Sequence, residues 1–249
     1  MKLGDQMIKF NSNQEPKHHS ITKTKKSRIV MGIVAMLLLL FAILMLFSKP
    51  LKRVIIGSYQ PTITAKTTKK AEQASGNFNY HDAKQPSYSD ILKARQHASD
   101  IATVGVIAIP SIKVYLPIGK GVANNVLALA AGTMRADQKM GQGNYALAGH
   151  NMNDAKTLFS PVYNYAQPGQ KIYLTNFRKV YVYQITNKQT IDPTQVEVTY
   201  NTDKPIITLI TCNLEGTKRI CVQGKLVQEY QYKQASKAVK QVLAHDYNR

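Results

Sequence analysis

The sequence predicts an all-β fold, a closed barrel or a sandwich of about eight short strands with short helices, preceded by one N-terminal transmembrane helix. Three observations support this prediction. Residues 29–47 form an uninterrupted apolar stretch. A series of strand-like runs lies between residues 103 and 227. Turn signals rich in Gly, Pro, Asn or Asp separate most of these runs, for example at 167–169.

The composition excludes several classes of protein. With 44% hydrophobic and 19% charged residues, the chain of 249 residues is not disordered. Two cysteines exclude a disulfide scaffold and a four-cysteine zinc site. The net charge of +19 implies polyanionic surroundings, such as nucleic acid, anionic lipid or an acidic wall polymer. Because the positive charge is spread along the chain, without a basic stripe or a Cys/His finger, we expect no nucleic-acid partner.

The apolar stretch 29–47 carries no charged side chain. As a helix it is ~28 Å long at ~1.5 Å per residue, close to the ~30 Å hydrocarbon core of a bilayer. It is longer than the apolar part of a signal peptide, and residues 48–53 offer no small-residue cleavage site. We therefore expect an uncleaved transmembrane signal anchor.

The flanking charges predict the orientation of this anchor. Six Lys or Arg residues lie within residues 9–28, and four lie within 48–67. The excess favours a cytoplasmic tail at 1–28 and an extracytoplasmic remainder. Residues 48–86 are rich in Thr, Lys, Gln and Ser and show little apolar periodicity, so we expect a stalk there and a folded domain at 87–249.

The folded domain begins with a predicted helix at 90–98, capped by Ser89 or Asp90. Short helical patches fit residues 122–130 and 155–159. Apolar residues at helical spacing predict a terminal helix at 233–245, and we expect it to pack on the barrel rather than on lipid. The predicted strands are 103–109, 112–116, 145–148, 171–175, 180–186, 196–200, 206–211 and 220–227.

Two residues at one predicted hairpin have catalytic potential. Cys212 ends the run 206–211, where a thiol is held rigidly and can meet solvent, although a lone cysteine is more often an inert apolar residue. Arg219 begins the next strand after a short polar connection, so the hairpin returns it close to Cys212. A guanidinium there can lower the pKa of a thiol and donate to an oxyanion, or it can be a solvated charge at a strand end.

A nucleophilic cysteine also needs an acid or base for the leaving group. Of the six histidines, His150 alone follows a buried-looking strand, 145–148, through Gly149. A histidine at such a position is otherwise a hydrogen-bonding loop residue. The three residues together are more specific than any one of them.

The segments Leu147-Ala148-Gly149-His150, Thr208-Leu209-Ile210-Thr211-Cys212 and Arg219-Ile220-Cys221-Val222 resemble the three signatures of sortases, the cysteine transpeptidases that attach proteins to Gram-positive cell walls. The resemblance covers roughly residues 87–228. It implies an eight-stranded sortase β-barrel, with Cys212 as nucleophile, His150 as acid and base, and Arg219 holding the oxyanion or positioning the substrate. The run 132–134 and the short connection 213–218 look like class A, housekeeping enzymes. The lid motif and second membrane span typical of class C enzymes are not visible in the sequence.

Class A enzymes resembling this one cleave Leu-Pro-x-Thr-Gly sorting signals between Thr and Gly through a cysteine thioester. They transfer the protein to the amine of a cell-wall precursor, lipid II or its cross-bridge, at the cell membrane. In this reading Cys212 reacts as a thiolate and His150 as an imidazolium. By resemblance, the apolar groove that takes Leu-Pro is placed at Pro117, Ala148, Val196, Val198, Thr208 and Ile210. Ordinary barrel core is the alternative for the two valines.

No cofactor is implied. Some family members bind calcium through carboxylates ahead of the histidine strand, but residues 133–144 contain only Asp137, so we expect calcium-independent activity. Cys221 lies two residues past Arg219 and is expected in the core. Two alternatives stay open: an L,D-transpeptidase, whose usual His-Gly-Cys pattern is not present, and a non-enzymatic basic membrane protein associated with the wall. Alkylation of Cys212 would separate an enzyme from a binding module.

Overall fold

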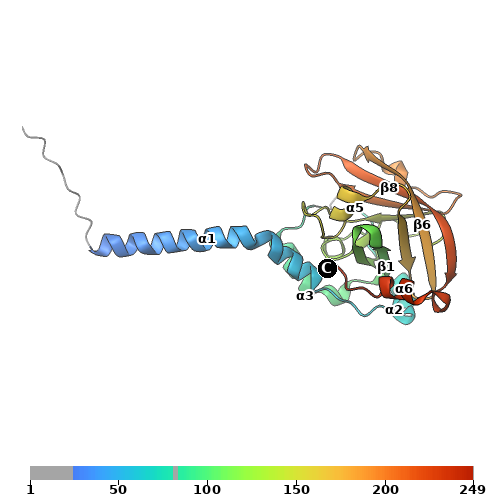
Figure 1. The fold of residues 1–249 in the computed structure, drawn as a ribbon, viewed down its shortest axis with the longest axis horizontal. Coiled ribbons are helices and arrows are strands. Elements are labelled where there is room, and N and C mark those ends of the chain that lie inside the picture. The colour runs from blue at the N-terminus through green and yellow to red at the C-terminus, as the bar shows by residue number, and fades with distance from the viewer. Residues whose placement is uncertain (1–24, 81–83, 249) are drawn as a thin grey trace, which may run out of the picture. The chain divides into compact units, whose positions relative to one another are not determined.

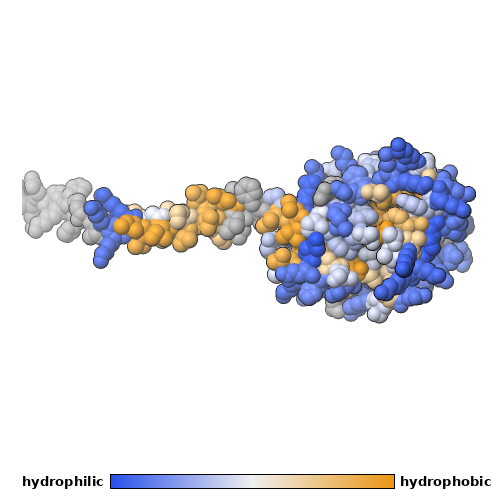
Figure 2. Space-filling view, turned by 90° about the horizontal axis from the view of Figure 1, so that it is seen from below, coloured by the Kyte–Doolittle hydropathy of each residue, from blue (hydrophilic) through white to orange (hydrophobic). Residues whose placement is uncertain are grey.

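The computed structural model describes residues 25–80 and 84–248, apart from the side chains of 44–49. The chain divides after Phe47 into two compact units. Helix α1 (Lys25–Gly57) contains the predicted span and continues beyond it through Pro50 (Figure 1). Its segment 25–43 is apolar and long enough to cross a membrane, and its hydrophobic surface is visible in Figure 2. Most of the predicted tail, residues 1–24, lies outside the described residues.

The segment 48–86 differs from the predicted stalk. The second compact unit begins at Ser48, and helix α2 (Ala65–Glu72) lies against the barrel strand β1 (Thr103–Ile109). Ile56 and Thr68 are fully buried, and the Thr68 hydroxyl donates to the carbonyl of Asn176 at 2.9 Å. The predicted boundary at residue 87 therefore has no counterpart in the packing. The apolar residues of the segment 48–86 are few and irregularly spaced, so local periodicity does not reveal the contacts that they make with distant strands.

The eight strands form a closed barrel in the order β1-β2-β3-β4-β7-β8-β6-β5, which confirms the predicted fold class. Most pairs are antiparallel, but β2 pairs with β3 and β4 pairs with β7 in parallel. The remaining strands are β2 (Val114–Gly119), β3 (Ala131–Thr133), β4 (Asn144–Ala148), β5 (Lys171–Thr175), β6 (Lys179–Ile191), β7 (Ile206–Cys212) and β8 (Arg219–Gln231).

Apolar side chains from all sides of the barrel fill its interior. Strands β1, β4 and β7 are buried almost throughout, because β-branched and other apolar residues occupy both faces of these segments. The largest completely buried residues include Tyr183, Phe159, Ile107, Leu147 and Ile172. The interior thereby holds the ends of β4 and β7 at a defined place.

The helices differ in length and position from the predicted ones. Helix α3 (Tyr88–Gln96) begins earlier than predicted, because Ser87 and Asp90 form a capping box. The patch 122–130 contains only α4 (Asn124–Leu127) and leads into β3, a short strand that was not predicted. The patch 155–159 is a loop, followed by α5 (Ser160–Tyr165). The short 3-10 helices are η2 (Ala98–Asp100), η3 (Pro110–Ile112), η4 (Val196–Thr199) and η5 (Tyr232–Gln234).

The terminal helix α6 (Lys237–Leu243) is shorter than predicted and packs on the barrel as expected. Its residue Leu243 and the preceding Ala235 contact Ala108, Val180 and Val182 in one apolar cluster. Both α2 and α6 contact β1, and both lie at the lower edge of the barrel in Figure 1.

The predicted strand 196–200 is wrong: Val196–Thr199 form η4. Alternating valines favour a strand in isolation. Here the carbonyls of Val198, Thr199 and Tyr200 accept hydrogen bonds from the side chains of Asn144 and Arg135, so no neighbouring strand is needed.

Candidate active site

The parallel pairing of β4 and β7 brings two of the predicted residues to one edge of the barrel. Ala148 lies opposite Ile210, so that His150, two residues after β4 ends, reaches the level of Cys212 at the end of β7. Two hydrogen bonds fasten the strand ends: the Gly149 amide donates to the Ile210 carbonyl at 3.0 Å, and the Asn151 amide group donates to the Cys212 carbonyl at 3.1 Å. These two hydrogen bonds hold the loop that carries His150 against the end of β7.

The hairpin of β7 and β8 brings in the third residue. Arg219 is the direct partner of Cys212 in the antiparallel register. All three side chains line one cavity of about 380 Å³. The cavity is also lined by Tyr80, Gln85, Leu127, Met134, Ala148, Gly149, Pro193, Ile210, Thr211 and residues 213–216.

The connection between β7 and β8 is organised by the side chain of Asn213. Its oxygen accepts from the Lys218 amide at 3.0 Å, and its amide group donates to the carboxylate of Glu215 at 2.7 Å. The loop carbonyls of Gly216 and Lys218 in turn accept from Nη1 of Arg219, at 3.0 and 3.2 Å. This loop therefore sets the position of the guanidinium beside the cavity.

His150 is buried, with 6% of its surface exposed. Burial lowers the pKa of its imidazole to about 4, because the charged form loses its hydration. Phe159 lies under the same turn: a Cβ at Gly149 would come within 2.6 Å of the phenyl ring, so that only glycine fits there. At neutral pH the imidazole is therefore uncharged, which differs from the imidazolium that the resemblance implied.

The two cysteines differ in their surroundings. Cys212 is half-buried at the cavity, whereas Cys221 is completely buried, and neither forms a disulfide. Burial raises the pKa of the Cys221 thiol to about 11. Cys221 is thus a core residue, as the sequence predicted, and only Cys212 meets the cavity.

The predicted substrate groove is partly placed at this cavity. Ala148 and Ile210 line it, and Val198 packs in the adjoining apolar cluster with Ile210 and Met134. Thr208 is fully buried, and its hydroxyl donates to the Val198 carbonyl at 3.4 Å. The cavity lining does not include Pro117, Val196 or Thr208.

Several cavity residues were missed by the sequence analysis. Leu127 is the last residue of α4, and Met134 comes directly after β3. Strand and helix patterns overlap in this region of the sequence. Tyr80 and Gln85 come from the segment predicted as a stalk. The Gln85 amide group donates to the Asn151 carbonyl at 2.6 Å, one residue from His150. No local signal in the sequence connects these segments to Cys212.

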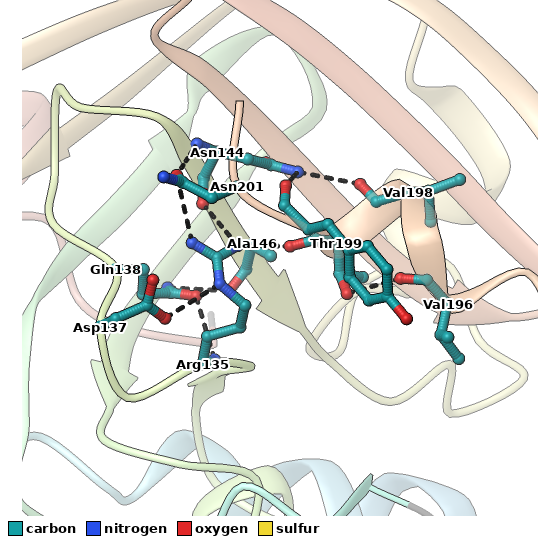
Figure 3. A network of polar contacts seen from close by, with 10 residues as sticks. Arg135, Asp137, Gln138, Asn144, Ala146, Val196, Val198, Thr199 and Asn201 are labelled. Atoms are coloured by element: carbon teal, nitrogen blue, oxygen red, sulfur yellow. Dashed lines mark hydrogen bonds and ion pairs between the residues drawn. The ribbon is translucent and has the colours of Figure 1, made fainter. Parts of the chain in front are cut away.

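A polar network holds η4 against β4 (Figure 3). Nη1 of Arg135 donates to the carbonyls of Asn144, at 3.1 Å, and Thr199, while Nε donates to the Asp137 carboxylate at 3.0 Å. The Asn144 amide group donates to the carbonyl of Val198 at 2.9 Å and to that of Tyr200 at 3.0 Å. The guanidinium thus joins three segments, β4, η4 and the loop after β3.

This network occupies the region considered for calcium. Asp137 is paired with Arg135, and the described residues contain no group of three or more His, Cys, Asp or Glu that could hold a metal. Calcium-independent activity stays a prediction, which chelation can test.

Comparison with known proteins agrees with this fold. A family model for the sortase domain matches residues 107–227. The sequence is 39% identical to sortase A of Listeria monocytogenes over 200 residues, covering 78% of this chain and 90% of that protein. It is 34% identical to sortase A of Streptococcus agalactiae over 231 residues, covering 88% of this chain and 93% of that protein.

Solved structures agree as well. The crystal structure of Listeria monocytogenes sortase A matches with a TM-score of 0.53 and 42% identity, over 57% of this chain and 97% of that one. Sortase C-3 from Streptococcus pneumoniae shares the fold, with a TM-score of 0.55 and 19% identity, over 79% of this chain and 99% of that one. Fold and relatives together define a β-barrel transpeptidase. More particularly, the chain belongs to the sortase family.

Proposed function

We propose that this chain is a membrane-anchored cysteine transpeptidase of the sortase A type. It cleaves Leu-Pro-x-Thr-Gly signals of surface proteins between Thr and Gly and transfers them to an amine of the cell-wall precursor lipid II. The observation that carries the proposal is the convergence of three residues on one cavity: Cys212 at the end of β7, Arg219 at the start of β8 and His150 in the loop after β4. The identity of 39% and 34% to two proteins named sortase A supports the subtype.

The acylation step begins with a proton transfer. The neutral imidazole of His150 takes the proton of the Cys212 thiol, and the thiolate attacks the carbonyl carbon of the substrate threonine. The tetrahedral oxyanion then collapses as the C–N bond breaks, and His150 returns its proton to the departing glycine amine. The product is a thioester on Cys212. The low pKa makes His150 a ready donor once it is charged, because the protonated imidazole is destabilised by burial.

The deacylation step reverses these roles. The incoming amine attacks the thioester carbon, His150 takes the amine proton, and the Cys212 thiolate leaves and is reprotonated. A thioester suits the reaction, since it persists long enough for an amine to intercept it. The protein itself supplies the acid, the base and the nucleophile.

Arg219 is suited to the oxyanion. Within the described residues, its recorded hydrogen bonds all use Nη1, which is bound to loop carbonyls. Nε and Nη2 therefore keep their donor capacity for a substrate in the cavity. A donor aimed at developing negative charge stabilises the transition state more than the ground state.

The walls of the cavity suit the Leu-Pro part of the signal. Leu127, Met134, Ala148 and Ile210 offer apolar surface, and Val198 extends it. The polar end of the cavity carries Cys212, His150 and Arg219. Such a division into an apolar pocket and a few placed polar groups is typical of specific sites.

The proposed location is the cell membrane, with the N-terminus in the cytoplasm and the barrel outside. The apolar segment 25–43 supports an anchor, and the excess of cations before it favours this orientation. Because the chain belongs to the sortase family, we no longer favour either alternative, the L,D-transpeptidase or the non-enzymatic wall protein.

The test uses the full chain in detergent with a Leu-Pro-x-Thr-Gly peptide and a glycine-based amine. Wild type should release the C-terminal fragment, form the amine adduct and carry an acyl group on Cys212 that mass spectrometry detects. Cys212→Ala should abolish all three signals, whereas Cys221→Ala should retain most activity, because Cys221 is enclosed in the core. Full activity of Cys212→Ala would end the proposal.

A further inference from the structure

The end of α1 and the helix α3 lie side by side on the surface of the barrel unit. Ile56 and Ile91 are both completely buried and belong to the same core cluster. The Lys52 ammonium donates to the Pro86 carbonyl at 3.3 Å, and the Arg95 guanidinium donates to the Ser58 hydroxyl at 2.9 Å. Because contacts exist at both ends, the two helical segments run alongside each other in the same direction.

The outward sides of these two segments are apolar. Leu51, Val54, Tyr88 and Leu92 are between 40% and 66% exposed. They are four of the eight large apolar side chains exposed in the described part of residues 48–248. Figure 2 shows such a hydrophobic patch on the barrel unit beside the end of α1. We call these four residues the α1–α3 face; a clustered apolar surface of this kind marks an interaction site.

Positive charge surrounds the α1–α3 face. The one carboxylate of α3, Asp90, accepts hydrogen bonds from Ser87. Among the side chains that the structure describes on these two segments, the cations are Lys52, Arg53, Lys93 and Arg95. A mixture of leucine, tyrosine and cations on exposed helices is the pattern of surfaces that lie in the interface of an anionic membrane. It disfavours a second copy of this chain, because the cations of two such faces would repel each other.

The chain itself keeps the face near the bilayer. Leu51 follows the apolar stretch 29–47 by four residues, which span at most ~14 Å when fully extended. We propose that the α1–α3 face docks on the anionic membrane surface, with its apolar side chains at the boundary of headgroups and acyl chains and its cations on lipid phosphates. This inference rests on the proposed membrane anchor. Docking through α3 gives the catalytic unit a fixed orientation above the bilayer.

The absence of tryptophan from the sequence allows a direct test. The full chain with Leu92→Trp is reconstituted in vesicles of phosphatidylglycerol and phosphatidylcholine that contain brominated lipid. Leu92 is the informative position, because it lies far along the chain from the anchor. We expect about a two-fold loss of its fluorescence, since the bromine atoms and the docked side chain share a depth of ~5–10 Å. Tyr165→Trp, at an exposed position of α5, is the matched control and should be unaffected.

A charge variant tests the lipid preference. Combining Leu92→Trp with Lys52→Gln, Arg53→Gln and Lys93→Gln should reduce the quenching, as should vesicles without phosphatidylglycerol. Equal quenching of both single-tryptophan proteins, or none for Leu92→Trp, overturns the docking. If the fluorescence change of Leu92→Trp depends on the density of protein in the vesicles and not on brominated lipid, the face binds a second copy of the chain. This result also overturns the docking.

The anchor is tested separately. Release of the full chain from vesicles by an alkaline wash would refute the anchor and the docking together. Retention in the vesicles with unquenched Leu92→Trp refutes the docking alone. Peptide cleavage by the same samples reports on the proposed transpeptidase reaction independently of both.

Discussion

Replacing Arg135 by glutamine tests whether the network around η4 controls substrate binding. Arg135 is only 17% exposed, so its hydrogen bonds are little weakened by solvent. The substitution removes the donations from Nη1 to the carbonyls of Asn144 and Thr199. The Asn144 amide group still holds the carbonyls of Val198 and Tyr200, so η4 is loosened without being released.

The expected size follows from these bonds. A hydrogen bond to a charged group contributes about 1.5–3 kcal/mol, and we expect a loss equivalent to one such bond. This corresponds to roughly a ten- to hundred-fold lower kcat/KM. The loss should appear mainly in KM, because Arg135 contacts η4, which carries Val198 of the groove, and not the catalytic residues.

The assay measures kcat and KM on one Leu-Pro-x-Thr-Gly peptide, with the rate of Cys212 alkylation by a small reagent as a measure of the intact catalytic end. Asp137→Asn is the control: its carboxylate is 66% exposed and pairs with the Arg135 guanidinium at the surface, so the change should stay within about five-fold. An unchanged KM in Arg135→Gln, or an equal effect of Asp137→Asn, would refute the reasoning.

Four further predictions follow from the site and the packing. Arg219→Lys keeps the charge but loses the planar fork, so the transition state should lose about 2–4 kcal/mol of stabilisation and kcat/KM should fall accordingly. A pH profile of kcat/KM that is only displaced along the pH axis, at constant height, would leave tuning of the thiol pKa as the only role of Arg219. Because the pKa of His150 is about 4 in the fold, below its ordinary 6.5, the unfolded chain takes up a proton first as the pH falls. The free energy of unfolding should therefore decrease between about pH 6.5 and 4, by about 2 kcal/mol at pH 5. His150→Asn should lack this loss in denaturant titrations. Removing residues 1–47 should leave an active enzyme, whereas removing 1–86 should lower its thermal midpoint, since buried Ile56 alone contributes about 1.5–3 kcal/mol; equal midpoints would contradict this. Excess EDTA should not change the rate, and a several-fold loss restored by calcium would show that a metal site exists.

The sequence alone determined the elements that depend on neighbouring residues. The apolar run 29–47, most barrel strands and the short hairpin that joins Cys212 to Arg219 are local patterns, and the structure contains them. The candidate residue His150 was recognised because it follows a buried strand within a short motif that resembles a known family. Its burial, and so the direction of its pKa shift, came only with the fold.

Tertiary structure decided the features that join distant segments. The parallel pairing of β4 with β7 sets His150 beside Cys212 across about sixty residues, and no local periodicity encodes that pairing. Residues 48–86 look like a stalk because their few apolar side chains find partners only on the closed barrel. The valines of 196–200 favour a strand, yet Arg135 and Asn144 donate to the carbonyls of Thr199 and Val198 and hold a 3-10 turn. In each case a long-range contact outweighs a local preference, because burial and hydrogen bonding between distant residues contribute more free energy than the propensity of a short segment.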